Sequence, residues 1–310
     1  MKNKISNSLK NLILNIAALI LCFSLFSFTT KTTVKKDTIQ NSFKLKTVII
    51  DPGHGVKPDN APPGHYSTGA SGTFSVERNV TLAIALKLQK AIEKDIDGVK
   101  AVLTRKTEED VSLEKRAEIA NDNKGNLFIS IHCNSLADKV VRKRVGTRHG
   151  KAIYRTTRVP DRSGKGTLML VYGLHRTNEE KNAIKNNQIE DDSSLNGDGL
   201  DPNDPVVIIL TNAYIRKFRK QSINIANLIT NEFVQTDGRI SEGMREQGVY
   251  VLCHSAMPSV LVETGYINNP DDEEYLNSEK GQNEIVNSIV RAITQYKAQV
   301  EYTTTANKIN

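Results

Sequence analysis

The strongest constraint on the fold is an alternation of short apolar runs with helix-like amphipathic segments. The run Thr47 to Asp51 places Val-Ile-Ile in its centre and ends abruptly at Pro52-Gly53. Continuous apolar runs of this length are typical of strands covered on both faces. From Val80, apolar residues recur every four positions as far as Ile92, which predicts a helix extending to about Lys94.

The same alternation continues along the chain. Further strands are predicted at 99–103, 127–133 and 259–263, and further helices at 112–121 and 214–233. A closing helix is predicted from the apolar face Ile285, Ile289, Ala292, Ile293 and Tyr296. Strands alternating with helices predict an α/β fold, a largely parallel or mixed sheet flanked by helices on both faces, in a single catalytic domain with an inserted section.

The N-terminus has the features of an export signal. Lys2, Lys4 and Lys10 precede the apolar stretch Leu12 to Phe28, so we expect a signal peptide at 1–30 and a periplasmic or secreted protein. An uncleaved anchor is the open alternative, and membrane contact is expected only through this segment. Bulky Leu21 precedes Cys22, which favours an ordinary apolar residue there over a lipid attachment site.

The remaining boundaries follow from local composition. A polar linker is expected at 31–46, the catalytic domain at 47–299 and a polar tail at 300–310. A polar section rich in Gly and Asp, at about 136–205, interrupts the alternation and contains one predicted strand, Thr167 to Tyr172. Such a long irregular stretch inside a domain is usually functional or disordered. Cys133 and Cys253 lie in apolar runs and are expected to be buried free thiols.

The net charge of +7 and the pI near 9.1 favour an anionic partner. The chain has no Trp, its few aromatic residues are not interleaved with basic ones, and it has no zinc-finger spacing. These features argue against nucleic-acid binding.

Polar residues that can perform chemistry lie at the ends of three predicted strands: His54, His132 and Glu263. In an open α/β sheet, such residues converge at the carboxyl edge, and Glu77 at the start of the first helix can face the same edge. Two imidazoles and one carboxylate suit a catalytic Zn²⁺ with a position left for water, and a second carboxylate can serve as the general base. This set predicts amide hydrolysis but does not say which Glu binds the metal.

The motifs around these residues resemble one family. Asp51-Pro52-Gly53-His54-Gly55, Glu77-Arg78-Asn79, Ser130 to Ser135 and Pro258 to Ile267 occur in the order of the zinc-dependent N-acetylmuramoyl-L-alanine amidases of the type-3 amidase family. The resemblance covers nearly all of Thr47 to Gln299.

The resemblance implies that His54, Glu77 and His132 are the zinc ligands and that Glu263 is the catalytic carboxylate. The implied reaction is hydrolysis of the amide between N-acetylmuramic acid and L-alanine of peptidoglycan, in cell-wall remodelling and daughter-cell separation. The alternatives are another zinc peptidase or deacylase acting on wall peptides, or a catalytically silent wall-binding protein.

Several other residues keep two interpretations. Asp51 either holds an imidazole or forms the turn before Pro-Gly, and Asn134 either positions substrate or caps its strand. Arg105 and Arg116 either support the fold or bind a substrate carboxylate. His65 is a weak candidate for the metal site, and the histidines outside the motifs are expected to be surface or core residues: His149, His175 and His254.

The section 136–205 is where the chain departs from a minimal family member. Members of this family can have an inserted helix that covers the site until an activator protein withdraws it. By that resemblance, an acidic side chain within Glu190 to Asp192 would block the zinc, and a solvated acidic loop is the alternative. The basic run Lys139 to Arg148 either contacts acidic wall polymer or is a solvated charged face.

Overall fold

The computed structural model describes residues 43–61, 66–189, 201 and 204–306, and for 303–306 only the backbone. The expected signal peptide with Cys22, most of the linker, His65 and Glu190 to Asp192 lie outside the described residues. Within the part that is described, no helix is both long and apolar enough to cross a bilayer.

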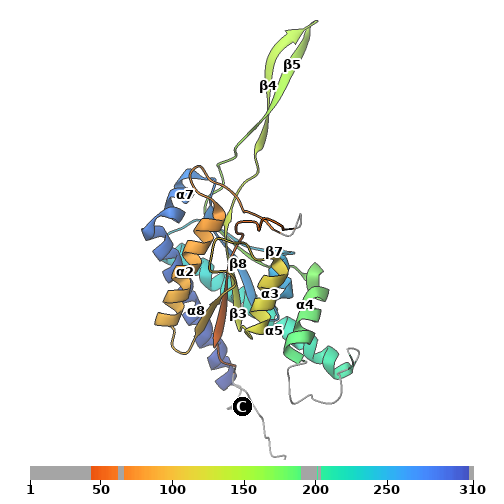
Figure 1. Ribbon diagram of the computed structural model, residues 1–310, viewed down its shortest axis with the longest axis vertical. Coiled ribbons are helices and arrows are strands. Elements are labelled where there is room, and N and C mark those ends of the chain that lie inside the picture. Colours follow the sequence, from red (N-terminus) through yellow and green to blue (C-terminus); the bar gives the residue numbers. More distant parts are fainter. Residues whose placement is uncertain (1–42, 62–65, 190–200, 202–203, 307–310) are drawn as a thin grey trace, which may run out of the picture. The chain divides into compact units, whose positions relative to one another are not determined.

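Six strands of the described chain form one mixed sheet in the order β2-β1-β3-β8-β6-β7. Three of them, β3, β8 and β7, are labelled in Figure 1. All neighbouring pairs are parallel except β6 and β8, which are antiparallel. The strands are β1 (Thr47–Pro52), β2 (Lys100–Leu103), β3 (Leu127–Asn134), β6 (Thr167–Tyr172), β7 (Ser241–Gln247) and β8 (Ser259–Tyr266). The α/β prediction is therefore confirmed, including the strand at Thr167 to Tyr172.

Helices cover both faces of this sheet because successive strand residues point to opposite sides. Val48 and Ile50 of β1 belong to the larger core, which also includes side chains of α2 (Glu77–Asp95), α5 (Pro205–Asn231) and α8 (Glu279–Ala306). Ile49 belongs to a second core on the other face, with residues of α3 (Leu113–Asp122) and α6 (Tyr250–His254).

The structure differs from the prediction at several element ends. Helix α5 begins at Pro205, with Asp204 as its N-cap, and continues in a π-helical turn at Glu232–Thr236. Helix α8 runs to Ala306 rather than ending near Gln299. Leu45, placed in the expected linker, is 1% exposed and belongs to the core.

The described part of the section 136–205 has more regular structure than its composition indicates. Strands β4 (Lys139–Arg148) and β5 (Lys151–Val159) form an antiparallel hairpin that is separate from the six-stranded sheet. After β6 follow a 3₁₀ turn (Leu174–Arg176), α4 (Thr177–Ile184) and a π-helical turn (Lys185–Ile189). The expectation of a mostly irregular section is wrong. Its polar sequence has little apolar periodicity, but β4 and β5 form by pairing with each other and α4 forms by packing on the rest of the domain.

Candidate metal and hydrolytic site

The ends of β1 and β3 bring two imidazoles together. His54 follows β1 after Gly53, and His132 lies near the end of β3; their ring centroids are 4.8 Å apart. A Cβ atom on Gly53 would come within 2.4 Å of the His132 ring, so glycine is required for this close approach. His54 itself adopts φ 60°, which turns the chain sharply after the strand.

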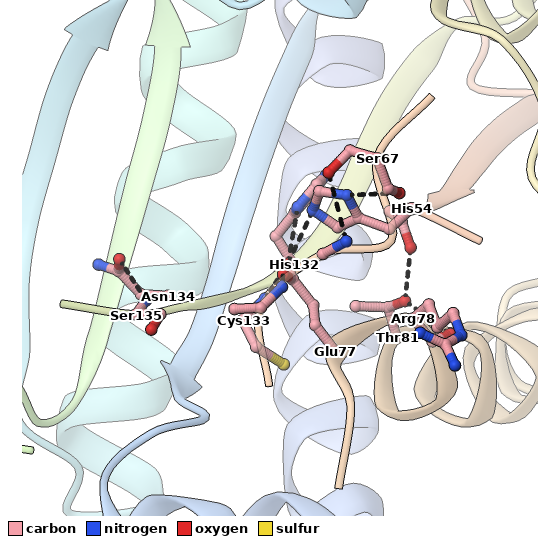
Figure 2. A network of polar contacts seen from close by, with 12 residues as sticks. His54, Ser67, Glu77, Arg78, Thr81, His132, Cys133, Asn134 and Ser135 are labelled. Carbon is pink, nitrogen blue, oxygen red and sulfur yellow. Dashed lines mark hydrogen bonds and ion pairs between the residues drawn. The ribbon is translucent and has the colours of Figure 1, made fainter. Parts of the chain in front are cut away.

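Glu77, the first residue of α2, lies between the two rings (Figure 2). Its Oε1 is 3.0 Å from His132 Nδ1 and 3.3 Å from His54 Nε2. The carboxylate is fixed from both sides, because Cys133 N donates to Oε1 at 3.0 Å and Ala70 N donates to Oε2 at 2.8 Å. One ligand atom from each of His54, Glu77 and His132 lies within 4.8 Å of the others, a group that could hold a metal ion.

A backbone carbonyl orients His54 for this role. His54 Nδ1 lies 3.2 Å from the Ser67 carbonyl oxygen, an acceptor, so Nδ1 carries the proton and donates. The lone pair of His54 Nε2 then faces Glu77. Metal-binding histidines commonly donate their second nitrogen in this way. Sequence reasoning could not find this partner, because the contact comes from a main-chain atom.

The electrostatics of the cluster favour a cation. Burial raises the pKa of Glu77, but the adjoining His132 and His54 rings outweigh burial and leave the pKa of Glu77 well below its usual range. Burial lowers the pKa of His132, yet Glu77 and Glu263 raise it overall. A buried, ionised carboxylate between two ring nitrogens is the donor set that zinc prefers, so the residues present fit this metal.

Glu263 completes the cluster from β8, where it is the register partner of His132 on β3. Burial raises the pKa of its carboxyl to about 7, and the nearby His132 and Glu77 act in opposite directions. Its Oε2 is buried without a hydrogen-bond partner among the described residues. A carboxyl that titrates near neutrality and has an unused oxygen suits a general base.

A cavity of about 240 Å³ adjoins the two imidazoles and gives access to the site. Its other lining residues are largely apolar or aromatic, including Tyr66, Leu113 and Tyr250. Sequence patterns did not single out these three residues, because they belong to loops and helix ends that meet only in the folded chain.

Asp51 and the two arginines support the fold. Asp51 accepts hydrogen bonds from Thr104, Ser130 and Arg116. Of the two interpretations of Asp51, the structure does not support the one in which it holds an imidazole, since its carboxylate is directed to a buried arginine. Arg105 donates to the carbonyls of Pro52 and Gly53 and, like Arg116, is nearly fully buried, so neither is placed to bind a substrate carboxylate.

The remaining candidates lie apart from the cluster or serve local structure. Asn134 accepts a hydrogen bond from the Ser135 amide at the end of β3, the capping alternative. His149 is in the exposed hairpin turn, His175 is in the 3₁₀ turn after β6, and His254 stacks on Tyr250. Cys133 and Cys253 are free and buried, as expected.

Comparison with known proteins gives one consistent result. Residues 48–295, more than half of the chain, match the family model described as N-acetylmuramoyl-L-alanine amidase. A protein named as a probable N-acetylmuramoyl-L-alanine amidase, AmiB, of Haemophilus influenzae is 29% identical over 81% of this chain, and the chain spans only 52% of that protein. The N-acetylmuramoyl-L-alanine amidase AmiA of Escherichia coli is 26% identical over 84% of this chain and 79% of its own length.

Solved structures share the fold. An N-acetylmuramoyl-L-alanine amidase from Clostridium difficile 630 is 20% identical, with a TM-score of 0.52, over 82% of this chain and 97% of that one. The CwlD amidase from Clostridioides difficile, solved in complex with the GerS lipoprotein, is also 20% identical, with a TM-score of 0.51, over 82% of this chain and 98% of that one.

Proposed function

Because the chain belongs to the N-acetylmuramoyl-L-alanine amidase family, we propose that it is a zinc enzyme that cuts the amide between N-acetylmuramic acid and L-alanine of peptidoglycan. The observation that supports this most is the convergence of His54, Glu77 and His132 beside Glu263. These three residues are the proposed zinc ligands.

When bound, zinc polarises an amide carbonyl and lowers the pKa of a water molecule. Glu263 takes the proton of the attacking water on its carboxylate and delivers it to the leaving nitrogen. A pKa of about 7 lets this group accept and release a proton near neutral pH. The Ser67 carbonyl keeps His54 in one tautomer, and the amides of Ala70 and Cys133 hold Glu77 in place.

The cavity beside the imidazoles is the proposed site of the scissile amide. Its aromatic and apolar side chains exclude water from the sugar and peptide on either side of that bond. Asp110 and Arg116 at the cavity wall form an ion pair with each other, so they shape the wall rather than bind the stem peptide.

Export to the cell wall, where peptidoglycan lies, is part of this proposal. The support is the sequence pattern of residues 1–30 and the name of one similar protein, the probable cell wall amidase LytH of Staphylococcus epidermidis. Control by an activator protein acting on the section 136–205 is also proposed, and the CwlD–GerS complex supports it by showing that one domain of this fold binds a lipoprotein.

Mass spectrometry of digested peptidoglycan sacculi tests the reaction. Zinc-loaded protein is expected to release free stem peptides that begin at alanine, and Glu263→Ala protein is expected to release none. Cleavage elsewhere in the stem would support a peptidase, whereas sacculus binding without cleavage by zinc-loaded protein would support a silent wall-binding protein.

A further inference from the structure

The hairpin β4–β5 is an exposed arm without a core of its own. Every residue from Lys139 to Val159 is exposed, and the two strands pair only with each other in the sheets of the described chain (Figure 1). A two-stranded hairpin that packs on nothing is at best marginally stable in water. Contact with another molecule would therefore stabilise it.

The hairpin is strongly cationic. Between positions 139 and 159 the sequence has no Asp or Glu, and its basic side chains are Lys139, Arg142, Lys143, Arg144, Arg148, Lys151, Arg155 and Arg158. At the base of the arm, Lys139 pairs with Asp161 at 2.8 Å. Beyond that pair, the positive charges of the arm lack acidic neighbours within the hairpin itself.

Like charges lie directly opposite each other across the two strands. Lys143 is the register partner of Arg155, and Arg148 is the register partner of Lys151. Directly opposed like charges destabilise a strand pair. The repulsion between these cations disfavours the isolated hairpin. An anionic surface in contact with them would offset that repulsion and stabilise the hairpin.

Apolar side chains are interleaved with the cations. Val145, Ile153 and Tyr154 in the outer half of the hairpin are 49%, 42% and 48% exposed. The Arg142 guanidinium lies 4.6 Å from the Tyr154 ring centroid. A cation and an apolar ring are therefore in direct contact on the surface of the hairpin. A partner that offers only anionic groups would leave these apolar side chains in water.

We propose that the β4–β5 hairpin binds the surface of an anionic phospholipid bilayer. The basic side chains contact lipid phosphates, and Tyr154, on the hairpin face that it shares with Arg142 and Arg144, enters the boundary between headgroups and acyl chains. An anionic bilayer offers phosphates for the charges of the hairpin and acyl chains for its exposed apolar residues. This inference does not depend on the proposed amidase reaction.

Vesicle flotation with the full chain tests the electrostatic part. The vesicles contain phosphatidylglycerol with phosphatidylcholine, or phosphatidylcholine alone, and the readout is the ratio of the two partition coefficients. One variant changes five hairpin cations to Gln: Arg142, Lys143, Arg144, Arg155 and Arg158. The matched control changes five exposed cations of α2, β2 and α5 to Gln: Lys90, Lys94, Lys100, Arg216 and Lys220.

The hairpin variant is expected to lower this ratio at least tenfold, whereas the control variant stays near the wild-type value, because each basic residue near an anionic surface contributes separately. The N-terminal apolar segment is present in all three proteins, so its contribution cancels. The wild-type ratio is expected to fall as NaCl rises from 0.1 to 0.5 M. Equal losses in both variants, or no loss in the hairpin variant, would overturn the proposal.

A fluorescent probe tests the apolar part. The chain contains no Trp, so Tyr154→Trp would introduce a single indole in the hairpin. Its emission is expected to shift to shorter wavelength with anionic vesicles and to stay unshifted with purified anionic wall polymer. An unshifted spectrum with vesicles, together with tight and hairpin-dependent binding of the wall polymer, would replace the bilayer by the polymer as the partner.

Discussion

His132 on β3 and Glu263 on β8 are register partners on adjacent parallel strands. The sheet itself therefore sets the proposed general base beside a proposed zinc ligand, without any contribution from a loop. Sites built on strands hold their geometry more firmly than sites built on loops. The consequences of this placement can be measured one residue at a time.

Glu263→Gln is expected to lower turnover about 10²- to 10⁴-fold, the usual contribution of a positioned general base. Zinc content should be unchanged, since Glu263 is not a proposed ligand. The measurement is kcat on a soluble muramoyl peptide, with bound zinc determined in the same sample. The control is Glu118→Gln on the exposed face of α3. Near wild-type turnover in Glu263→Gln would exclude this residue as the base.

We predict that Glu273 of α7 (Pro270–Asn277) is a positioning residue for the proposed zinc site. Its carboxylate accepts hydrogen bonds from the amides of Thr73, Phe74 and Ser75, just before Glu77. Glu273→Ala would leave these donors unpaired and let the start of α2 shift. We expect zinc affinity to fall about 10- to 100-fold, as for other groups that orient metal ligands.

Isothermal titration of the metal-free protein with zinc measures this effect. The adjacent exposed Glu274→Ala is the matched control, and Glu273→Gln should recover part of the affinity because it keeps one acceptor oxygen. Wild-type zinc affinity in folded Glu273→Ala protein would contradict the positioning role.

Arg116 is buried between two carboxylates, Asp51 at 2.6 Å and Asp110 at 2.5 Å. Arg116→Met would leave both acids buried without their cation, which is expected to destabilise the protein by about 3–5 kcal/mol. Urea unfolding followed by circular dichroism measures the loss. Changing Asp51 and Asp110 to Asn in the same protein should recover part of it, and an Arg116→Met variant as stable as wild type would refute the account.

Glu180 of α4 is expected to make the stability of the protein depend on pH. Burial raises its pKa from 4.5 to about 7, more than Tyr172 and Arg219 lower it. The folded state thus holds a proton that the unfolded state releases, and stability falls as pH rises from 4.5 to about 7. Glu180→Gln removes this loss.

The variant and wild type should therefore be similarly stable at pH 4. At pH 8, Glu180→Gln should be more stable by about 3 kcal/mol. Thermal unfolding at both pH values checks this, and an equal difference at pH 4 and pH 8 would assign the effect to packing instead of to the proton.

The sequence predicts the central strands and helices well because their residues are buried on a regular period. Ile84, Leu88 and Ile92 of α2 are fully buried, as their spacing requires. In contrast, β7 has the sequence Ser-Glu-Gly-Met-Arg-Glu-Gln and is a partly exposed edge strand. β7 forms because it can pair with the free edge of β6, and its own sequence has no apolar pattern that would predict a strand.

The same distinction applies to the site. The positions of His54, His132 and Glu263 follow from the rule that strand ends converge. The roles of Ser67, Ala70 and Glu273 could not be predicted, because they depend on main-chain contacts or on partners up to 200 positions apart. For Asp51 the motif left two interpretations open, and its actual role as the partner of the buried Arg116 depends on a residue 65 positions away.

The most direct test of the central claim is zinc K-edge X-ray absorption of the purified protein in solution. We predict one zinc per chain with two imidazoles and a carboxylate in its coordination shell, and loss of this signal in the His54→Ala, Glu77→Gln and His132→Ala variants. Zinc bound with an unchanged shell in any of these variants would contradict the proposed ligand set.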